Sequence, residues 1–117
     1  MLIGVPTEIK TDENRVGMTP MAVRELKHNG HDIIVETNAG HNIGIDDKEY
    51  ETVGAEIVAT GKDIFQRAEL VVKVKEPQPI ECEMLDHGQL LFTYLHLAPD
   101  LDQTAALIKS GCVAIAY

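Results

Sequence analysis

Three side chains that can bind an anion or move a proton, Arg15, Lys75 and His96, follow three different apolar runs of the sequence. Arginine presents a planar fork that matches a carboxylate. Lysine can share that carboxylate and polarise an adjacent carbonyl oxygen, and histidine can exchange a proton with that oxygen near neutral pH. Together the three residue types fit an anionic carbonyl compound, and a 2-oxo acid would engage all of them.

Each of these side chains also has a purely structural interpretation. Arg15 lies in a polar loop and could be a solvated charge. Lys75 could pair with the neighbouring Glu76, and His96 could be a core histidine that hydrogen-bonds to backbone. Lys73 lies two residues before Lys75, within the apolar run at residues 70–74. The sequence alone leaves these alternatives open.

The elements that must position these side chains are predicted by hydrophobic patterning. The apolar runs are residues 2–6, 32–36, 55–59, 70–74, 90–95 and 112–117. They are rich in Val, Ile and Leu, which is typical of strands buried on both faces. The segments between them carry helix signals, at residues 19–30, 46–54, 60–67, 79–86 and 99–111. Thr19 followed by Pro20, for example, is typical of an N-cap and a first helical position.

Strands that alternate with helices predict an α/β fold with a mostly parallel sheet. We expect about six strands and five helices, with helices on both faces, in a Rossmann-like or flavodoxin-like domain. Ligands of such sheets bind at the carboxyl ends of the strands. Arg15, Lys75 and His96 are therefore expected on the same side of the sheet.

Composition excludes several classes of function. The 117 residues are 44% hydrophobic and 25% charged, with a net charge of −9, so neither nucleic acid nor an anionic membrane is an expected partner. Cys82 and Cys112 fit no metal spacing and no disulfide framework, and we expect both to be reduced and buried. No metal pattern and no G-x-G-x-x-G loop occur. The first residues lack the features of a signal peptide, and a cytoplasmic protein is expected.

Four stretches together resemble the N-terminal part of the bacterial alanine dehydrogenase family. They are "IGVPTEIKTDENRVGMTP" (3–20), "NAGHNIGIDDKEYETVGAEIV" (38–58), "VVKVKEPQ" (71–78) and "LFTYLHLAPD" (91–100). The resemblance runs in order over essentially all 117 residues, and the combination is more specific than any one motif.

The resemblance implies an enzyme that interconverts L-alanine with pyruvate and ammonia and uses NAD. By position, Arg15 and Lys75 correspond to the groups that hold the substrate carboxylate and carbonyl, and His96 to the acid/base. Tyr94 lies near that pocket by position only. The family's NAD-binding domain, a catalytic aspartate and a returning C-terminal segment have no counterpart here. Residues 1–117 are therefore expected to be an incomplete N-terminal substrate domain, inactive alone, of an enzyme that forms hexamers.

Two alternatives stay open. The nucleotide-binding subunit of nicotinamide transhydrogenase shares the "GVPTE" type of opening and the "VGAEIV" stretch, but His96 and Lys75 favour the dehydrogenase. A stand-alone, non-catalytic module with the same fold is the other alternative. The run at 112–117 stops without a following helix, which indicates either a longer native protein or an edge strand.

Overall fold

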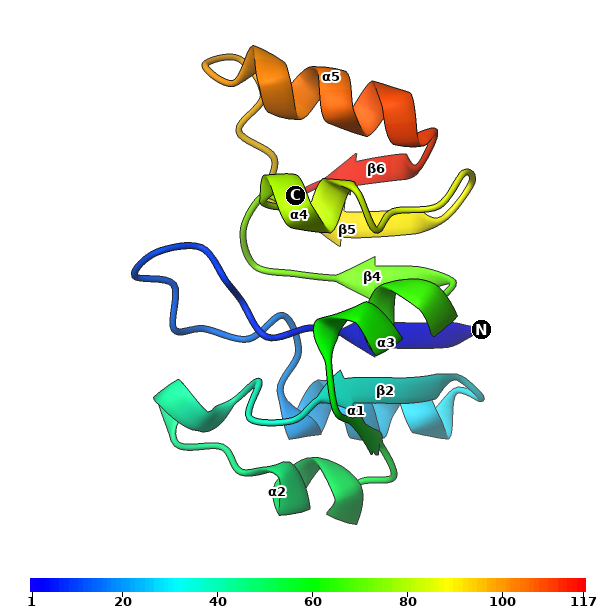
Figure 1. Ribbon diagram of the computed structural model, residues 1–117. Coiled ribbons are helices and arrows are strands. Elements are labelled where there is room, and N and C mark those ends of the chain that lie inside the picture. The colour runs from blue at the N-terminus through cyan, green and yellow to red at the C-terminus, as the bar shows by residue number, and fades with distance from the viewer.

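The computed structural model describes residues 1–117, in which strands and helices alternate along the chain (Figure 1). The strands are β1 (Leu2–Val5), β2 (Asp32–Glu36), β3 (Glu56–Val58), β4 (Leu70–Val72), β5 (Leu90–Thr93) and β6 (Val113–Ala116). The helices are α1 (Pro20–His28), α2 (Asp47–Thr52), α3 (Gly61–Arg67), α4 (Pro79–Cys82) and α5 (Leu101–Ser110), with a short 3-10 helix η1 (His41–Ile43) after β2. The predicted six strands and five helices are confirmed.

All six strands form one parallel sheet in the order β3-β2-β1-β4-β5-β6. This is the order of a doubly wound α/β sheet, in which the direction of winding reverses between β1 and β4. The carboxyl ends of all the strands therefore lie at the same end of the sheet, on the left in Figure 1. A long loop, residues 6–19, projects there between β1 and α1. A ligand site is expected at this edge, outside the reversal point.

Two hydrophobic cores lie on opposite faces of the sheet, because successive strand residues point to opposite sides. Ile33 and Val35 of β2 pack with α1 and α2, whereas Ile34 packs with α3, α4 and α5. Helices therefore cover both faces, as predicted. Helix α3 approaches β1 so closely that a Cβ added at Gly4 would lie 2.6 Å from Ile64 Cγ2. This contact requires glycine in the middle of β1.

Strand β6 departs from the expectation that every strand is buried on both faces. All four of its residues are exposed, and the exposed apolar side chains Val113, Ile115 and Tyr117 lie along the strand and just after it. The reason is its place at the edge of the sheet, where it pairs only with β5 and is not reached by α1 or α2. In the sheet formed by residues 1–117, β6 is thus an edge strand, which is compatible with both alternatives for residues 112–117.

Local capping explains most helix boundaries. The Thr19 side chain accepts a hydrogen bond from the Ala22 backbone N–H, and Pro20 opens α1. Helix α5 ends at Gly111, whose φ of 71° is the left-handed conformation that favours glycine.

Most elements are shorter than predicted by one to three residues, and α4 differs most, because it stops at Cys82 instead of residue 86. Strand β4 stops at Val72 instead of residue 74. None of the helices is both long and apolar enough to cross a bilayer.

Candidate functional site

The structure places Arg15, Lys75 and His96 beyond the carboxyl ends of β1, β4 and β5, at one edge of the sheet. Arg15 and Lys75 line the same hollow of about 260 Å³, together with Val74, Tyr94 and Tyr117. His96 is not part of that lining and lies three residues past the end of β5, on an exposed loop. Its ring centroid is 6.0 Å from that of Tyr94 in an edge-on arrangement, so the imidazole lies beside the hollow.

Lys75 has no carboxylate partner. Its ammonium nitrogen lies 4.7 Å from the centroid of the Tyr94 ring, a cation–π contact that orients the side chain without neutralising it. The suggested pairing with Glu76 does not occur, because Glu76 pairs with Lys10 instead. Burial raises the pKa of Glu76, but the hydrogen bond from Lys10, a backbone hydrogen bond and the charges of Lys10 and Lys75 together outweigh burial and leave that pKa lowered. Lys75 is thus a cation that remains available to an anionic ligand.

Arg15 is exposed but held in place by Glu13. The guanidinium donates two hydrogen bonds to that carboxylate, from Nε to Oε1 at 2.8 Å and from Nη2 to Oε2 at 2.7 Å. The hydrogen bond from Arg15 is the main reason that the pKa of Glu13 falls to about 2. Nη1 makes no hydrogen bond, so this side of the fork is free for a second carboxylate. Arg15 is therefore more than a freely solvated charge.

Behind the hollow, the ammonium group of Lys73 is buried between two glutamates. Its nitrogen donates to Glu8 Oε2 at 3.1 Å and to Glu81 Oε1 at 2.8 Å. The side chains of all three residues are 3% exposed or less. Burial raises the pKa of Glu81, and the charge of Lys73 opposes that rise only in part. We call these three residues the buried lysine cluster.

The buried lysine cluster fixes the backbone that carries Lys75. The second oxygen of Glu8 accepts a hydrogen bond from the Val74 backbone N–H at 2.6 Å. The second oxygen of Glu81 accepts one from the Gln78 backbone N–H at 2.7 Å, at the start of α4. Because Glu8 belongs to the loop that also carries Arg15, one buried ammonium ties together that loop, the end of β4 and α4.

From the other side, side chains of β5 and of Tyr117 hold the same backbone. The Tyr117 hydroxyl donates to the carbonyl oxygens of Lys73 and Val74, at 3.2 and 2.9 Å. The Thr93 hydroxyl donates to the Lys75 carbonyl at 2.7 Å. Residues 73–75 follow the last residue of β4, but the Lys73 N–H still donates to the Phe92 carbonyl at 3.0 Å. These side chains therefore reinforce the end of the backbone ladder.

Close backbone contact brings the Arg15 loop against β4. A Cβ added at Gly17 would lie 2.5 Å from the Val72 carbonyl oxygen. Since two backbones approach each other here, a larger residue at this position would push the loop away from Lys75.

The sequence does not reveal the roles of four residues: Glu8, Glu13, Glu81 and Tyr117. The burial of Lys73 was also missed, although one signal was present: a lysine inside an apolar run must find an acidic partner if it is buried. The partner's identity was not readable, because Glu8 lies 65 residues away in the chain. The prediction that both cysteines are buried is wrong for Cys112, which is half-buried, and correct for Cys82. Both are free thiols.

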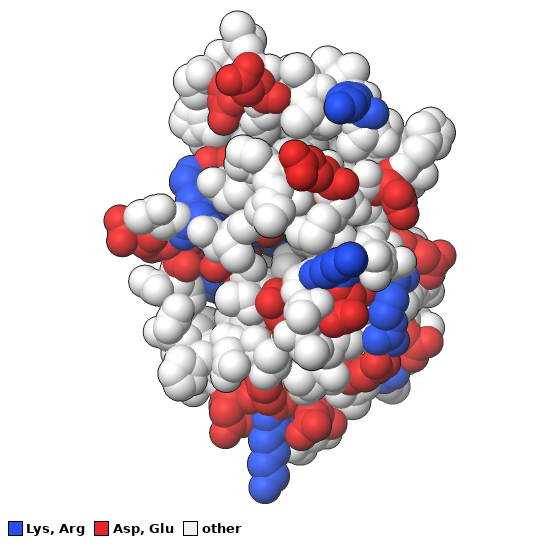
Figure 2. Space-filling view, viewed as in Figure 1, with Lys and Arg blue, Asp and Glu red and all other residues white.

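The chain's own residues do not fit a nicotinamide dinucleotide at the reversal point. A sheet of this order holds the dinucleotide phosphates on a short glycine turn that leads from β1 directly into α1. Here residues 6–19 separate the two elements, and they form a polar loop without that glycine spacing. Acidic side chains are also spread widely over the face shown in Figure 2, with fewer basic ones among them. Arg15 on this loop and Lys75 just past β4 line one hollow, which suits a small anion instead.

Known proteins share both the sequence pattern and the fold of this chain. The sequence profile of the family described as "Alanine dehydrogenase/PNT, N-terminal domain" matches residues 4–117. The chain is 50% identical over 117 residues to alanine dehydrogenases from Methanococcus maripaludis and Bacillus subtilis, and it covers 31% of each of them. It therefore spans about a third of the length of these relatives.

Solved structures show the same similarity. A solved L-alanine dehydrogenase superimposes with a TM-score of 0.96 at 50% identity, over all of this chain and 32% of that one. The transhydrogenase from Sinorhizobium meliloti superimposes with a TM-score of 0.92 at 27% identity, over 99% of this chain and 34% of that one.

The buried lysine cluster makes a prediction about stability. Lys73→Met should lower the free energy of unfolding by about 3–5 kcal/mol, because it leaves Glu8 and Glu81 buried without a counter-charge. Lys27→Met is the matched control: Lys27 pairs with Asp32 at 2.9 Å at the surface, and its loss should cost about 1 kcal/mol or less. Urea unfolding of both variants measures the difference. Equal losses of stability would contradict the role given to Lys73.

Proposed function

Since the chain belongs to the alanine dehydrogenase/PNT N-terminal domain family, we propose that it is the substrate-binding part of an NAD-dependent alanine dehydrogenase. The reaction converts L-alanine, water and NAD⁺ into pyruvate, ammonium and NADH, with release of one proton, and it is reversible. In this proposal residues 1–117 are an incomplete N-terminal substrate domain of a hexameric cytoplasmic enzyme. The nucleotide is held by a domain outside these residues.

The observation that supports this function most is that Arg15 and Lys75 line the same hollow. Both cations project beyond the ends of neighbouring strands, and both keep N–H donors free for an anion. Free Nη1 of Arg15 and the ammonium of Lys75 can hold the two oxygens of a carboxylate. Lys75 can also donate to the adjacent carbonyl oxygen of pyruvate, which makes its carbon more electrophilic.

His96 supplies the proton transfers in this scheme. When ammonia adds to the carbonyl carbon of pyruvate, the developing alkoxide takes a proton from the imidazolium, and a carbinolamine forms. The imidazole, now neutral, takes a proton from the ammonio nitrogen of this adduct. As imidazolium again, it protonates the hydroxyl, which leaves as water and gives the iminium that accepts hydride. In the direction of alanine oxidation, neutral His96 takes the proton from the water that attacks the iminium carbon.

The loop that carries His96 is exposed and outside the lining of the hollow. A substrate held by Arg15 and Lys75 would therefore meet this side chain at the rim, past the Tyr94 ring. That position is consistent with an acid/base that exchanges protons with water between steps.

A transhydrogenase-type domain is the second candidate, because that fold superimposes almost as well. Identity to the matched transhydrogenase is 27%, against 50% to the matched alanine dehydrogenases. The difference favours the dehydrogenase.

The carboxylate role predicts a specific kinetic change in the intact protein. Arg15→Ala and Lys75→Ala should each lower kcat/KM for pyruvate about 10- to 100-fold, mainly through KM, since each removes charge-assisted hydrogen bonds to the substrate. Arg24→Ala and Lys48→Ala remove exposed charges elsewhere and should leave the kinetics near those of the parent. Steady-state kinetics with varied pyruvate measures this. Near-normal values for both Arg15 and Lys75 variants would remove the site assignment.

The acid/base role predicts a different pattern. His96→Ala should lower kcat by about 10²- to 10⁴-fold, with a much smaller change in pyruvate affinity, because it removes a proton carrier rather than a carboxylate contact. His28→Ala, at the exposed end of α1, is the matched control. Separate measurement of kcat and of the pyruvate dissociation constant distinguishes the two effects. An unchanged kcat in the His96 variant would refute the role.

A further inference from the structure

The carboxylate of Glu13 is fixed beside the hollow that Arg15 and Lys75 line. Its side chain is 8% exposed, whereas the side chain of Arg15 is 64% exposed. Oε1 of Glu13 accepts hydrogen bonds from Arg15 Nε at 2.8 Å and from the Arg15 backbone N–H at 2.9 Å, and Oε2 accepts one from Nη2 at 2.7 Å. Because three hydrogen bonds hold this carboxylate, its negative charge has a defined position next to the hollow.

This charge acts on both cations of the hollow. The pKa of Glu13 is lowered to about 2, first by the side-chain hydrogen bond from Arg15 and, among smaller causes, by the charge of Lys75. Glu13 is therefore ionised near neutral pH and lies within electrostatic reach of both cations. Since Glu13 does not line the hollow, its carboxylate leaves room there for a ligand.

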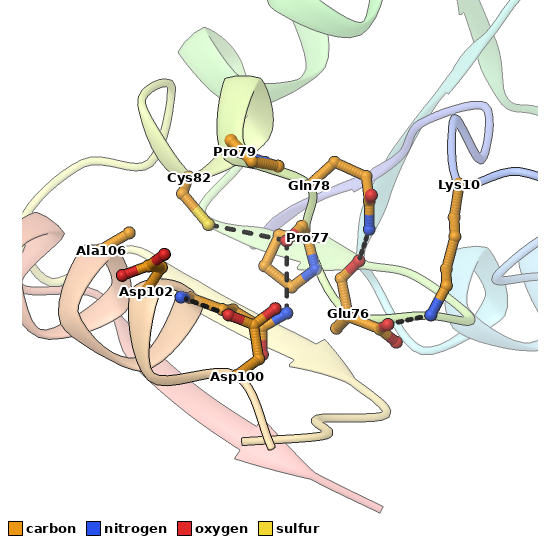
Figure 3. Close-up of a pocket in the computed structure, with 10 residues that line it drawn as sticks. Lys10, Glu76, Pro77, Gln78, Pro79, Cys82, Asp100, Asp102 and Ala106 are labelled. Atoms are coloured by element: carbon orange, nitrogen blue, oxygen red, sulfur yellow. Dashed lines mark hydrogen bonds and ion pairs between the residues drawn. The ribbon is translucent and has the colours of Figure 1, made fainter. Parts of the chain in front are cut away.

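The remaining charges near the hollow do not cancel that of Glu13. Lys10, the other cation of loop 6–19, is already paired with Glu76 (Figure 3). The buried lysine cluster places two carboxylates against one ammonium, which gives it a formal charge of −1. Its field reaches the hollow: the pKa of Arg15 is raised mainly by the hydrogen bond and charge of Glu13, and Glu8 adds a smaller effect.

The two cations of the hollow are thus offset by two negative charges before any ligand binds. One of these charges is Glu13, and the other is the surplus carboxylate of the buried lysine cluster. A first ligand carboxylate is still bound, because Arg15 and Lys75 offer it charge-assisted hydrogen bonds at short range. A second carboxylate on the same ligand would meet no uncompensated positive charge and would be repelled by Glu13. Like charges brought together in this way reject the wrong partner.

We propose that Glu13 is a specificity-determining residue, whose charge makes the hollow select 2-oxo acids with one carboxylate over those with two. The proposal rests on the proposed function, because it concerns the ligand of the same hollow. Glu13 is also the negative charge that can be removed without opening the buried lysine cluster. Its neutralisation therefore tests selectivity without a large loss of stability.

Oxamate and oxalate separate the effect of charge from that of size. The two anions are nearly equal in size, but oxamate carries one negative charge and oxalate carries two. Isothermal titration calorimetry on the intact protein in the presence of NADH measures both dissociation constants and does not depend on turnover. We expect the parent to bind oxamate more tightly than oxalate, and the ratio of the two dissociation constants is the quantity to compare among variants.

Three variants then assign the preference. Glu13→Gln removes the charge at constant size and should lower the preference for oxamate about tenfold, mainly through tighter binding of oxalate. Glu13→Asp keeps the charge on a shorter side chain, so it should keep the parent's ratio even where both affinities fall. Asp12→Asn is the matched control, since it removes an exposed charge from the same loop. Asp12 has a φ of 63°, a left-handed conformation that asparagine also adopts.

The opposite results would overturn the proposal. These are equal affinities of the parent for the two anions, an unchanged ratio in Glu13→Gln, an equal fall of the ratio in Asp12→Asn, or a fall in Glu13→Asp as large as in Glu13→Gln. An unchanged ratio with normal oxamate binding would overturn this proposal alone and leave the proposed function standing. Failure of the parent to bind either anion would overturn both.

Discussion

The candidate site depends on one buried ammonium group. Lys73 lies between Glu8 and Glu81 with almost no contact with solvent, and the free oxygens of those carboxylates hold backbone N–H groups at the end of β4 and the start of α4. A buried ion pair of this kind contributes little net stability compared with a well-packed apolar cluster, but breaking it is costly. Its importance here is geometric, because it joins the loop of Arg15 to the strand end of Lys75.

The anion-binding groups are arranged so that they remain incompletely neutralised. Glu13 occupies one side of the Arg15 fork, and Tyr94 holds Lys75 through its π face rather than through a charge. Both cations are therefore oriented before a ligand arrives and still keep donors for it. On a chain with a net charge of −9, such a pair of available cations is the feature on which the proposed binding of a small anion rests.

Much of the fold was predictable from the sequence, since apolar runs and capping residues are local signals. Thr19–Pro20 and Gly111 marked helix ends correctly, and six runs rich in Val, Ile and Leu became six parallel strands. The exposure of β6 was not predictable, because whether a strand is central or at an edge depends on sheet order. The early end of β4 was missed for a similar reason: Val74 and Lys75, just past the strand, are held by side chains distant in the chain, those of Glu8, Thr93 and Tyr117.

For the site, the sequence predicted which residues lie at the carboxyl edge but not how they are paired. Arg15 and Lys75 do share a hollow, while His96 lies beside it rather than within its lining. Glu8 lies 65 residues from Lys73 in the chain, and Glu13 is one of several acids in the polar loop 6–19. Neither partnership could be read from the sequence. The sheet order alone would suggest a dinucleotide site at the carboxyl ends of the strands. The polar loop 6–19 does not fit one, so the ligand has to be inferred from the side chains present.

The most direct test of the central claim is a crystal structure of the intact protein with oxamate, an unreactive analogue of pyruvate. If Arg15 and Lys75 hold the substrate, the oxamate carboxylate will lie within about 3.2 Å of the Arg15 guanidinium and of the Lys75 ammonium, with a ring nitrogen of His96 at hydrogen-bond distance from the carbonyl oxygen. Oxamate bound elsewhere, with Arg15 still paired only to Glu13 and Lys75 still stacked on Tyr94, would contradict it.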